Sequence, residues 1–365
     1  MKKEKTTAYR KPADGVFVIL LTAVLTFIAC SLLLKLYNAD LGTAYAALIR
    51  GAWGTKNNIG ETLSKAAPLV LVALGFAVGA QSGMFNIGGE GQMFAGALGA
   101  SLVALYLPAE TPAVIGILLV FIAGAVFGML WALPVAYLKT KFGVSEIVMT
   151  VMLNEVASGI VSYLVSFPMK DPMTPIHQSA ILGANFQMPT LIKGTKIHLG
   201  IVITLVLVFV VWFFMSRSTL GYQLKATGLS NRAALYAGMP VTSIMILSLM
   251  ISGGFAGLAG AFEATGVHYR LIEGVTGGFG FTAIIVAQLG KNRPIGIAVA
   301  ALVFASLTVG SAAMQRAVGT PAMLSEMIEG LAVIFFIISE FAVKRVRKEI
   351  NNKAIAKELA AAQKA

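Results

Sequence analysis

Apolar stretches of about twenty residues alternate with short polar connections along almost the whole chain. A helix of about twenty apolar residues is long enough to cross the hydrocarbon core of a bilayer. The pattern therefore predicts an all-α, polytopic membrane protein with about ten transmembrane helices, of which the eighth is short or partly re-entrant. The predicted spans cover residues 16–37, 61–82, 88–107, 113–138, 144–167, 198–216, 241–266, 279–290, 294–315 and 321–343.

The polar segments divide the chain into one membrane domain with two tails. Residues 1–14 and 344–365 are basic tails, and residues 15–343 form the transmembrane domain. Within it, residues 38–58 are expected to form an interfacial helix anchored by Trp53. By parity, the longest connection, residues 168–197, lies outside, and the loop of residues 217–240 lies inside.

Charge supports this topology. Only 12% of the residues are charged and 57% are apolar, yet the formal net charge is +12. Most Lys and Arg fall in the two tails and in the turns that the ten-span pattern places on one side. Membrane insertion keeps basic residues in the cytoplasm, so both termini are predicted to be cytoplasmic. The basic excess therefore indicates orientation in a membrane and not a surface for nucleic acid.

The stretch "GMFNIGGEGQMFAGALGA", residues 83–100, places polar side chains on a glycine-broken segment inside the membrane. Adjacent glycines break a helix there, and the freed backbone groups need protein partners or a polar cavity. Discontinuous helices are typical of transport pathways. We expect Asn86, Glu90 and Gln92 to line such a pathway, with Asn154 as a weaker candidate. "GGFGF", residues 277–281, is a second break in the other half of the chain.

Acids and glycines within the spans can also serve helix packing instead of transport. Charged side chains inside a membrane are costly and functional by default, although hydrogen bonding between helices is the commoner outcome for any one of them. The candidate acids are Glu90, Glu146, Glu155, Glu326 and Glu329. Small residues four apart, as at Gly124 and Gly128 or Gly253 and Gly257, favour close helix packing.

Catalytic and metal-binding patterns are missing from the sequence. Gly290-Lys291 is followed by Asn292, so no phosphate-binding loop is present. The three histidines, His177, His198 and His268, are far apart and lack acid or cysteine partners at ligand spacing. We expect neither an enzyme nor a cofactor of its own, and with one cysteine, Cys30, no disulfide.

The inner loop contains "NRAALYAG", with Arg232, Ala233, Ala234 and Gly238. This arrangement resembles the Ala-Ala-x-x-x-Gly core of the cytoplasmic helix by which ABC importer permeases contact a separate ATPase, although Arg232 stands where the general motif has Glu. The resemblance implies a docking helix with small residues against the ATPase, ended by the glycine. The candidate coupling residues are Ala226, Gly228, Arg232, Ala233, Ala234 and Gly238.

Residues 221–266, "GYQLKATGLSNRAALYAGMPVTSIMILSLMISGGFAGLAGAFEATG", look like the core of the ribose and branched-chain amino acid permease superfamily. The broken segment at residues 83–100 and the "DP…QSAIL" element at residues 171–182 resemble its nucleoside-type branch. That resemblance implies two inverted helical bundles, roughly spans two to five and seven to ten. It also implies a bacterial plasma membrane, a second homologous permease, a cytoplasmic ATPase that binds ATP and magnesium, and an extracellular substrate-binding lipoprotein of the basic membrane protein type.

Three alternatives stay open at this stage. An ion-coupled secondary transporter also fits the broken helices and intramembrane acids. The second alternative is a membrane-embedded enzyme such as a prenyl transferase. Such an enzyme needs paired aspartates to bind magnesium pyrophosphate, but Asp14, Asp40 and Asp171 are scattered along this chain. An importer of the same class carrying a simple sugar or a branched-chain amino acid is the third.

Overall fold

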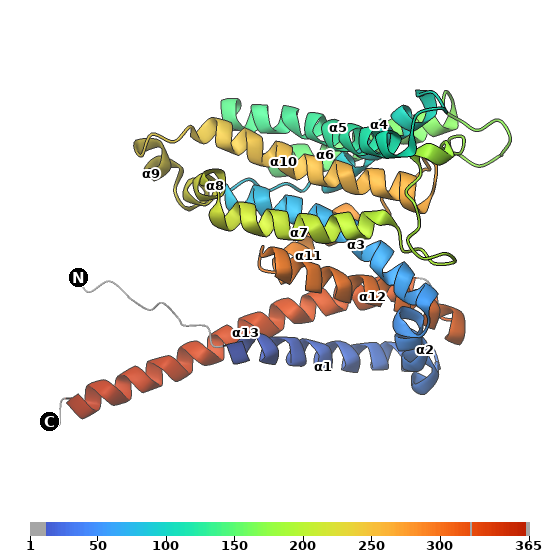
Figure 1. Cartoon of the computed structure of the whole chain (residues 1–365). Coiled ribbons are helices and arrows are strands. Elements are labelled where there is room, and N and C mark those ends of the chain that lie inside the picture. Colours follow the sequence, from blue (N-terminus) through green and yellow to red (C-terminus); the bar gives the residue numbers. More distant parts are fainter. Residues whose placement is uncertain (1–11, 322, 363–365) are drawn as a thin grey trace. The chain divides into compact units, whose positions relative to one another are not determined.

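A computed structural model describes residues 12–321 and 323–362 (Figure 1). Residues 1–11 of the first predicted tail and residues 363–365 of the second lie outside the described residues. The regular structure of the described part is helical apart from three isolated β-bridges, which confirms the all-α class. In order, the helices are α1 (Pro12–Leu36), α2 (Leu41–Trp53), α3 (Lys56–Gln81), α4 (Gly89–Tyr106), α5 (Ala113–Phe142), α6 (Glu146–Ser166), the 3-10 helix η1 (Ala184–Phe186), α7 (Leu199–Arg217), α8 (Thr219–Leu229), α9 (Asn231–Tyr236), α10 (Val241–Phe262), the π-helix η2 (Glu263–Val267), α11 (Phe279–Leu289), α12 (Pro294–Val318) and α13 (Met323–Ala362).

Each predicted span coincides with one of these helices, and the predicted interfacial segment forms α2. Within the described residues, six helices are long and apolar enough to cross a membrane: α3, α5, α6, α7, α10 with η2, and α12. Shorter apolar segments cover Leu20–Leu36 and Phe279–Leu289. These helices support a multi-pass membrane protein, whereas ten crossings stay a prediction.

The described residues of the stretches 12–51 and 307–362 form one compact unit. Its described part pairs α1 with α13 around a small core that includes Cys30, Leu34 and Met314. The predicted last span ends at residue 343, but α13 continues without a break through Lys344 to Ala362. At about 1.5 Å per residue, this helix is about 60 Å long, roughly twice the hydrocarbon thickness. The described part of the second tail is therefore helical.

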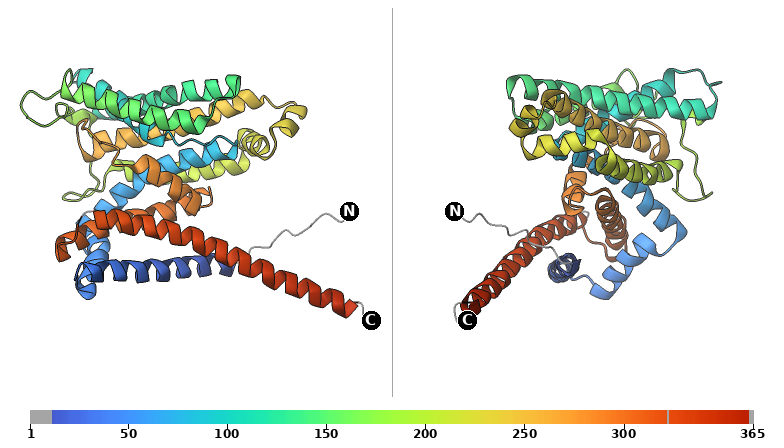
Figure 2. Two further views of the ribbon diagram at one scale, coloured as in Figure 1. Left: turned by 180° about the vertical axis from the view of Figure 1, so that it is seen from behind. Right: turned by 60° about the vertical axis from the view of Figure 1, so that its left-hand side comes forward.

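Residues 52–306 form the second unit. In it, α10 packs against α3, α4 and α5, which Figure 2 shows from two further directions. These crossings depend on glycine. A Cβ added at Gly128 would overlap the carbonyl oxygen of Gly253, and one added at Gly96 would overlap that of Gly257. The predicted packing role of these glycine repeats is confirmed. The two inverted bundles stay a prediction. Helix α10, from the second predicted bundle, packs directly against helices of the first.

The long connection of residues 168–197 is held by backbone hydrogen bonds to the segment that follows η2. The amide of Ser179 donates to the carbonyl oxygen of Leu271 at 2.8 Å, and that of Leu182 donates to Tyr269 at 2.9 Å. Ser179 is fully buried, and its Oγ accepts from the amide of Leu271. The connection is thus an ordered part of this unit.

Candidate functional site

The first glycine break lies between α3 and α4, where the backbone leaves the helix at Gly83 with φ of +81°. The Asn86 amide nitrogen donates to Gln92 Oε1 at 2.8 Å and to Ser252 Oγ on α10 at 2.7 Å. Its oxygen accepts from the amide of Gly88 at 2.9 Å and from Gln92 Nε2 at 3.1 Å. Asn86 and Gln92 are both buried, so their amides stabilise the break by hydrogen-bonding to each other and to its backbone.

The Glu90 carboxylate joins this break to the second one. It accepts hydrogen bonds from the Thr276 hydroxyl and from the amide of Gly280, the latter at 2.7 Å. Gly278 has φ of +77°, and α11 begins directly after it. The first amides of a helix lack intrahelical acceptors and carry partial positive charge, which a carboxylate satisfies. Glu90 therefore caps α11 from the first turn of α4.

Asn154, on α6, holds the other side of the α4 N-terminus. Its Oδ1 accepts from the amide of Gly91 at 2.8 Å, and its Nδ2 donates to the carbonyl oxygen of Ile87 at 3.0 Å. Side chains from α4, α6 and α10 and the segment before α11 thus converge on one turn. We call this set the break network; its members are Asn86, Glu90, Gln92, Asn154, Ser252, Thr276 and Gly280.

Sequence reasoning named four members of the break network and missed Ser252 and Thr276. Ser252 directly precedes Gly253-Gly254, and Thr276 directly precedes Gly277-Gly278. A hydroxyl residue directly before two glycines is the sequence feature that could have identified both residues. The four predicted side chains are brought together as expected, but their polar groups are occupied by protein partners. Contact of these residues with a solute stays a prediction.

The other candidate acids are dispersed. Glu146 begins α6 and forms a 2.6 Å ion pair with Lys139, so it lies at a helix end and has a charged partner. Glu155 is exposed on α6. The side chains of Glu326 and Glu329 lie outside the described residues.

A second polar cluster lies beside the π-helix η2. His268 Nε2 is 3.6 Å from Glu263 Oε2, and Lys196 Nζ is 3.3 Å from Glu61 Oε1. Burial, followed by the positive charges of Lys65 and Lys196, lowers the pKa of His268 below its ordinary value. The folded protein therefore favours the neutral imidazole at this position.

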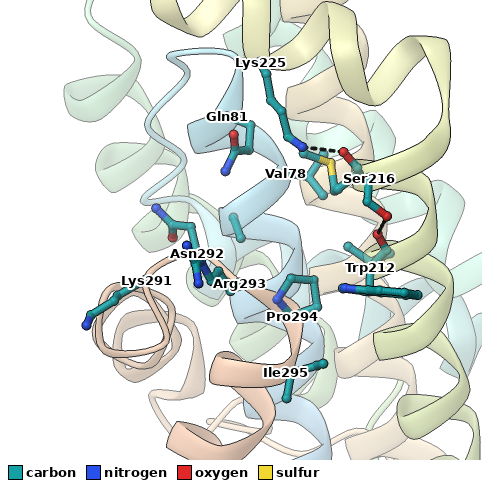
Figure 3. Close-up of a pocket in the computed structure, with 13 residues that line it drawn as sticks. Val78, Gln81, Trp212, Ser216, Lys225, Lys291, Asn292, Arg293, Pro294 and Ile295 are labelled. Atoms are coloured by element: carbon teal, nitrogen blue, oxygen red, sulfur yellow. Dashed lines mark hydrogen bonds between the residues drawn. The ribbon is translucent and has the colours of Figure 1, made fainter. Parts of the chain in front are cut away.

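A pocket of about 540 Å³ lies apart from the break network, among α3, α7, α8 and the turn between α11 and α12 (Figure 3). Lys225 reaches into its rim from α8, where its Nζ donates to the carbonyl oxygen of Met215 at 2.6 Å. None of the residues predicted to line a pathway belongs to this pocket. The lining residues are Ala77, Val78, Gln81, Val211, Trp212, Met215, Ser216, Lys225, Lys291, Asn292, Arg293, Pro294 and Ile295.

The predicted coupling loop forms two short helices, α8 and α9. Ser218 Oγ caps α8 by accepting from the amide of Gly221 at 2.9 Å, and Ser230 Oγ caps α9 by accepting from Ala233 at 3.3 Å. Gly238, with φ of +77°, follows α9, and Met239 donates back to the Ala234 carbonyl oxygen. This left-handed glycine stops the helix. The predicted helix end at Gly238 is confirmed.

The faces of α9 differ from the sequence expectation. Ala234 is only 3% exposed and is buried within the chain itself, whereas Arg232 and Ala233 are exposed. The most exposed large apolar side chains of the segment are Leu229, at 88%, and Tyr236, at 91%. Of the other candidates, Ala226 is half-buried and Gly228 lies against the end of α3, where a Cβ would overlap the carbonyl oxygen of Gln81.

Comparison with known proteins decides the family. The family model described as branched-chain amino acid transport system / permease component matches residues 58–337. The chain belongs to this permease family. The permease is 33% identical to the guanosine ABC transporter permease protein NupP of Bacillus subtilis, over 94% of its own length and 99% of the relative's. It is 33% identical to the glucose ABC transporter permease protein TsgB13 of Haloferax volcanii, over 89% of each chain. It is 31% identical to the nucleoside ABC transporter permease protein NupB of Lactococcus lactis, over 90% and 92%.

Besides the polar cluster beside η2, the unit of residues 52–306 contains three features that bear on function. The break network holds the two glycine breaks together, the α8–α9 segment presents exposed apolar side chains, and the pocket joins basic and apolar walls. The sequence pattern indicated the residues of the break and the α8–α9 helices. It did not indicate the pocket, because the lining residues come from three distant stretches of the chain, at residues 77–81, 211–225 and 291–295.

Proposed function

We propose that this permease is the membrane subunit of an ATP-driven importer of nucleosides. The observation that carries the proposal is the similarity to the guanosine permease, which extends over 94% of this chain and 99% of the relative. Similarity to the nucleoside permease of Lactococcus lactis supports the same cargo. An importer of a simple sugar is the second candidate, supported by the glucose permease relative.

The proposed assembly contains a second, homologous permease, a cytoplasmic ATPase and an extracellular substrate-binding lipoprotein. ATP and magnesium bind to the ATPase, and the permease itself carries out no chemistry. It spans the plasma membrane of a bacterium, with both termini in the cytoplasm. The concentration of basic residues in the predicted inner segments supports this orientation.

In this proposal the α8–α9 segment transmits the conformational change of the ATPase. Large apolar side chains exposed in a polar loop mark a protein contact, and Leu229, Leu235 and Tyr236 are more than half exposed. We assign the contact to this exposed face, together with Arg232 and Ala233. Ala234 supports it from inside, because its small side chain lets α9 pack on its own subunit.

The break network is proposed to shape the substrate pathway. Asn86, Glu90, Gln92 and Asn154 hold α4 and α11 at their glycine breaks, and the pathway runs beside these N-termini. Rearrangement of the network exposes amides that pair with the donors and acceptors of a nucleoside. Discontinuous helices at such a position support this role.

Reconstitution of the whole transporter tests the proposal. The permease, its second permease and the ATPase are placed in proteoliposomes, the loaded lipoprotein is added outside, and uptake of radiolabelled guanosine, uridine, glucose and leucine is compared. We expect nucleoside uptake that requires internal ATP and fails with ADP. Uptake driven by a proton gradient without ATP would establish the secondary-transporter alternative, and ATP-driven uptake of glucose alone would assign the cargo as a sugar.

A further inference from the structure

The pocket between α7, α8 and the α11–α12 turn has two chemically different walls. Ala77, Val78, Val211, Trp212 and Ile295 form an apolar wall, and Trp212 and Ile295 are also exposed on the outside of this unit. The other lining residues are mostly polar, and Figure 3 shows Lys225 beside Val78 and Arg293 next to Ile295. Such a combination fits a ligand with both a polar head and an apolar body.

The polar rim is strongly basic. Lys225, Lys291 and Arg293 line it, and the lining contains no carboxylate. The hydrogen bond from Lys225 Nζ to the Met215 carbonyl oxygen fixes the ammonium group at the rim and leaves it two further hydrogens to donate (Figure 3). Lys225 and Arg293, with no carboxylate among the lining residues, favour an anionic ligand.

The turn that carries two of these cations is held in an uncommon conformation. Lys291 and Asn292 both have positive φ, of 56° and 52°. Such backbone angles cost energy for residues other than glycine and persist only when the surrounding structure determines them. The turn is fixed by backbone hydrogen bonds: the amide of Asn292 donates to the Ala287 carbonyl oxygen, and the amide of Arg293 donates to that of Gly290. Asn292 Oδ1 is buried and has no hydrogen-bond partner in the described part of the chain.

We propose that this pocket binds the phosphate-bearing headgroup of an anionic phospholipid such as phosphatidylglycerol. Lys225 and Arg293 bind the phosphate, and Val211, Trp212 and Ile295 pack against the first part of an acyl chain. Tryptophan is enriched at the depth of lipid headgroups, which agrees with this placement. By the predicted topology, the site lies at the cytoplasmic surface, where anionic lipids attract basic segments.

The lipid would bridge the coupling segment and the α11–α12 turn, since Lys225 belongs to α8 and Arg293 precedes α12. The site does not depend on which solute is carried. If the pocket does not bind lipid, the proposed import of nucleosides is unaffected. If the permease does not import nucleosides, the proposed lipid site is unaffected.

Quenching of Trp212 by brominated lipids tests the proposal directly. The full chain carries three tryptophans, so Trp53→Phe with Trp131→Phe leaves Trp212 as the single tryptophan, which is excited selectively. This protein is reconstituted in bilayers that mix brominated phosphatidylglycerol or brominated phosphatidylcholine with the unlabelled lipid. The ratio of the two binding constants at Trp212 measures the preference for the anionic headgroup. We expect a preference of about fivefold for each contributing basic residue.

The matched variants are Lys225→Gln with Arg293→Gln in the pocket and Lys141→Gln at a different basic turn. The pocket pair should lower the preference to about one, since the site then lacks its phosphate-binding charges, whereas Lys141→Gln should retain it. A ratio near one in the unsubstituted pocket, or an unchanged ratio in the pocket pair, would overturn the proposal. A measurement with added inorganic phosphate distinguishes binding of a lipid headgroup from binding of a soluble anion. If inorganic phosphate removes the preference at millimolar concentration, the pocket binds soluble anions and the lipid proposal fails.

Discussion

Replacement of Glu90 by alanine should loosen the start of α11. The Glu90 carboxylate accepts hydrogen bonds from the Thr276 hydroxyl and the Gly280 amide, and both bonds are buried. In Glu90→Ala these two donors lose their acceptor. Glu90→Gln keeps one oxygen for the Gly280 amide, and its new NH2 group can donate to the Thr276 hydroxyl. The expected order of stability is therefore wild type, then Glu90→Gln, then Glu90→Ala.

The magnitude follows from the two donors. A buried donor left without an acceptor costs about 1–3 kcal/mol, so the pair costs about 2–4 kcal/mol once the hydroxyl is allowed to turn. In Glu90→Gln, two charge-assisted bonds become neutral ones, which costs about 1 kcal/mol. A local opening made easier by 2–4 kcal/mol increases amide exchange roughly 30-fold to 1,000-fold.

Hydrogen exchange followed by mass spectrometry on the purified full chain measures this effect on peptides covering residues 276–289. The matched control is Glu155→Ala, which removes an exposed acid from a neighbouring helix. Exchange should rise strongly in Glu90→Ala, rise slightly in Glu90→Gln and stay at the wild-type level in Glu155→Ala. Wild-type exchange in Glu90→Ala would refute the capping role, and equal losses in both Glu90 variants would show that charge rather than geometry stabilises the contact.

Three further changes have separate readouts. Gly128→Leu should lower the unfolding free energy in detergent by about 1–3 kcal/mol through overpacking, and Gly159→Leu, at a glycine with open space, should not. Ala234→Leu should destabilise the isolated permease, whereas Tyr236→Ala should leave its stability unchanged and reduce co-purification of the ATPase; the reverse result would place Ala234 in the contact. Because the pKa of His268 is lowered, its stabilisation is complete above its ordinary value of 6.5 and is lost as the pH falls. The loss of unfolding free energy between pH 7.5 and 5.5 should therefore be smaller in His268→Gln, and an equal loss would contradict this assignment.

Apolar run length predicted the helices well, because a chain in lipid must satisfy its backbone within each segment. It predicts where a span ends but not where a helix ends, as α13 illustrates. The basic residues from Lys344 onward indicate a membrane boundary, but the segment remains a good helix former with spaced opposite charges. Glu340 pairs with Lys344 at 3.2 Å and Arg345 pairs with Glu349 at 3.8 Å. A charge boundary therefore did not coincide with a helix boundary.

The candidate residues of the break could be found from their types, but their partners could not. Glu90 is 186 residues from Thr276 and 190 from Gly280 in the sequence, and nothing local connects them. The same limit applies to Ala234. Its motif indicates a short helix ended by Gly238, but the face of that helix that is buried depends on how α8 and α9 pack on the rest of the unit.

The long separation between Glu90 and its partners has a consequence for synthesis. Chains grow at about 5–20 residues per second, so the start of α4 is made about 10–40 seconds before Gly280 exists. During that interval the nascent chain holds an acidic side chain in a predicted span without the donors that later bind it. Insertion of α4 must therefore tolerate an acid that still lacks its final hydrogen-bond donors. Chains that terminate before Thr276 would never supply these donors.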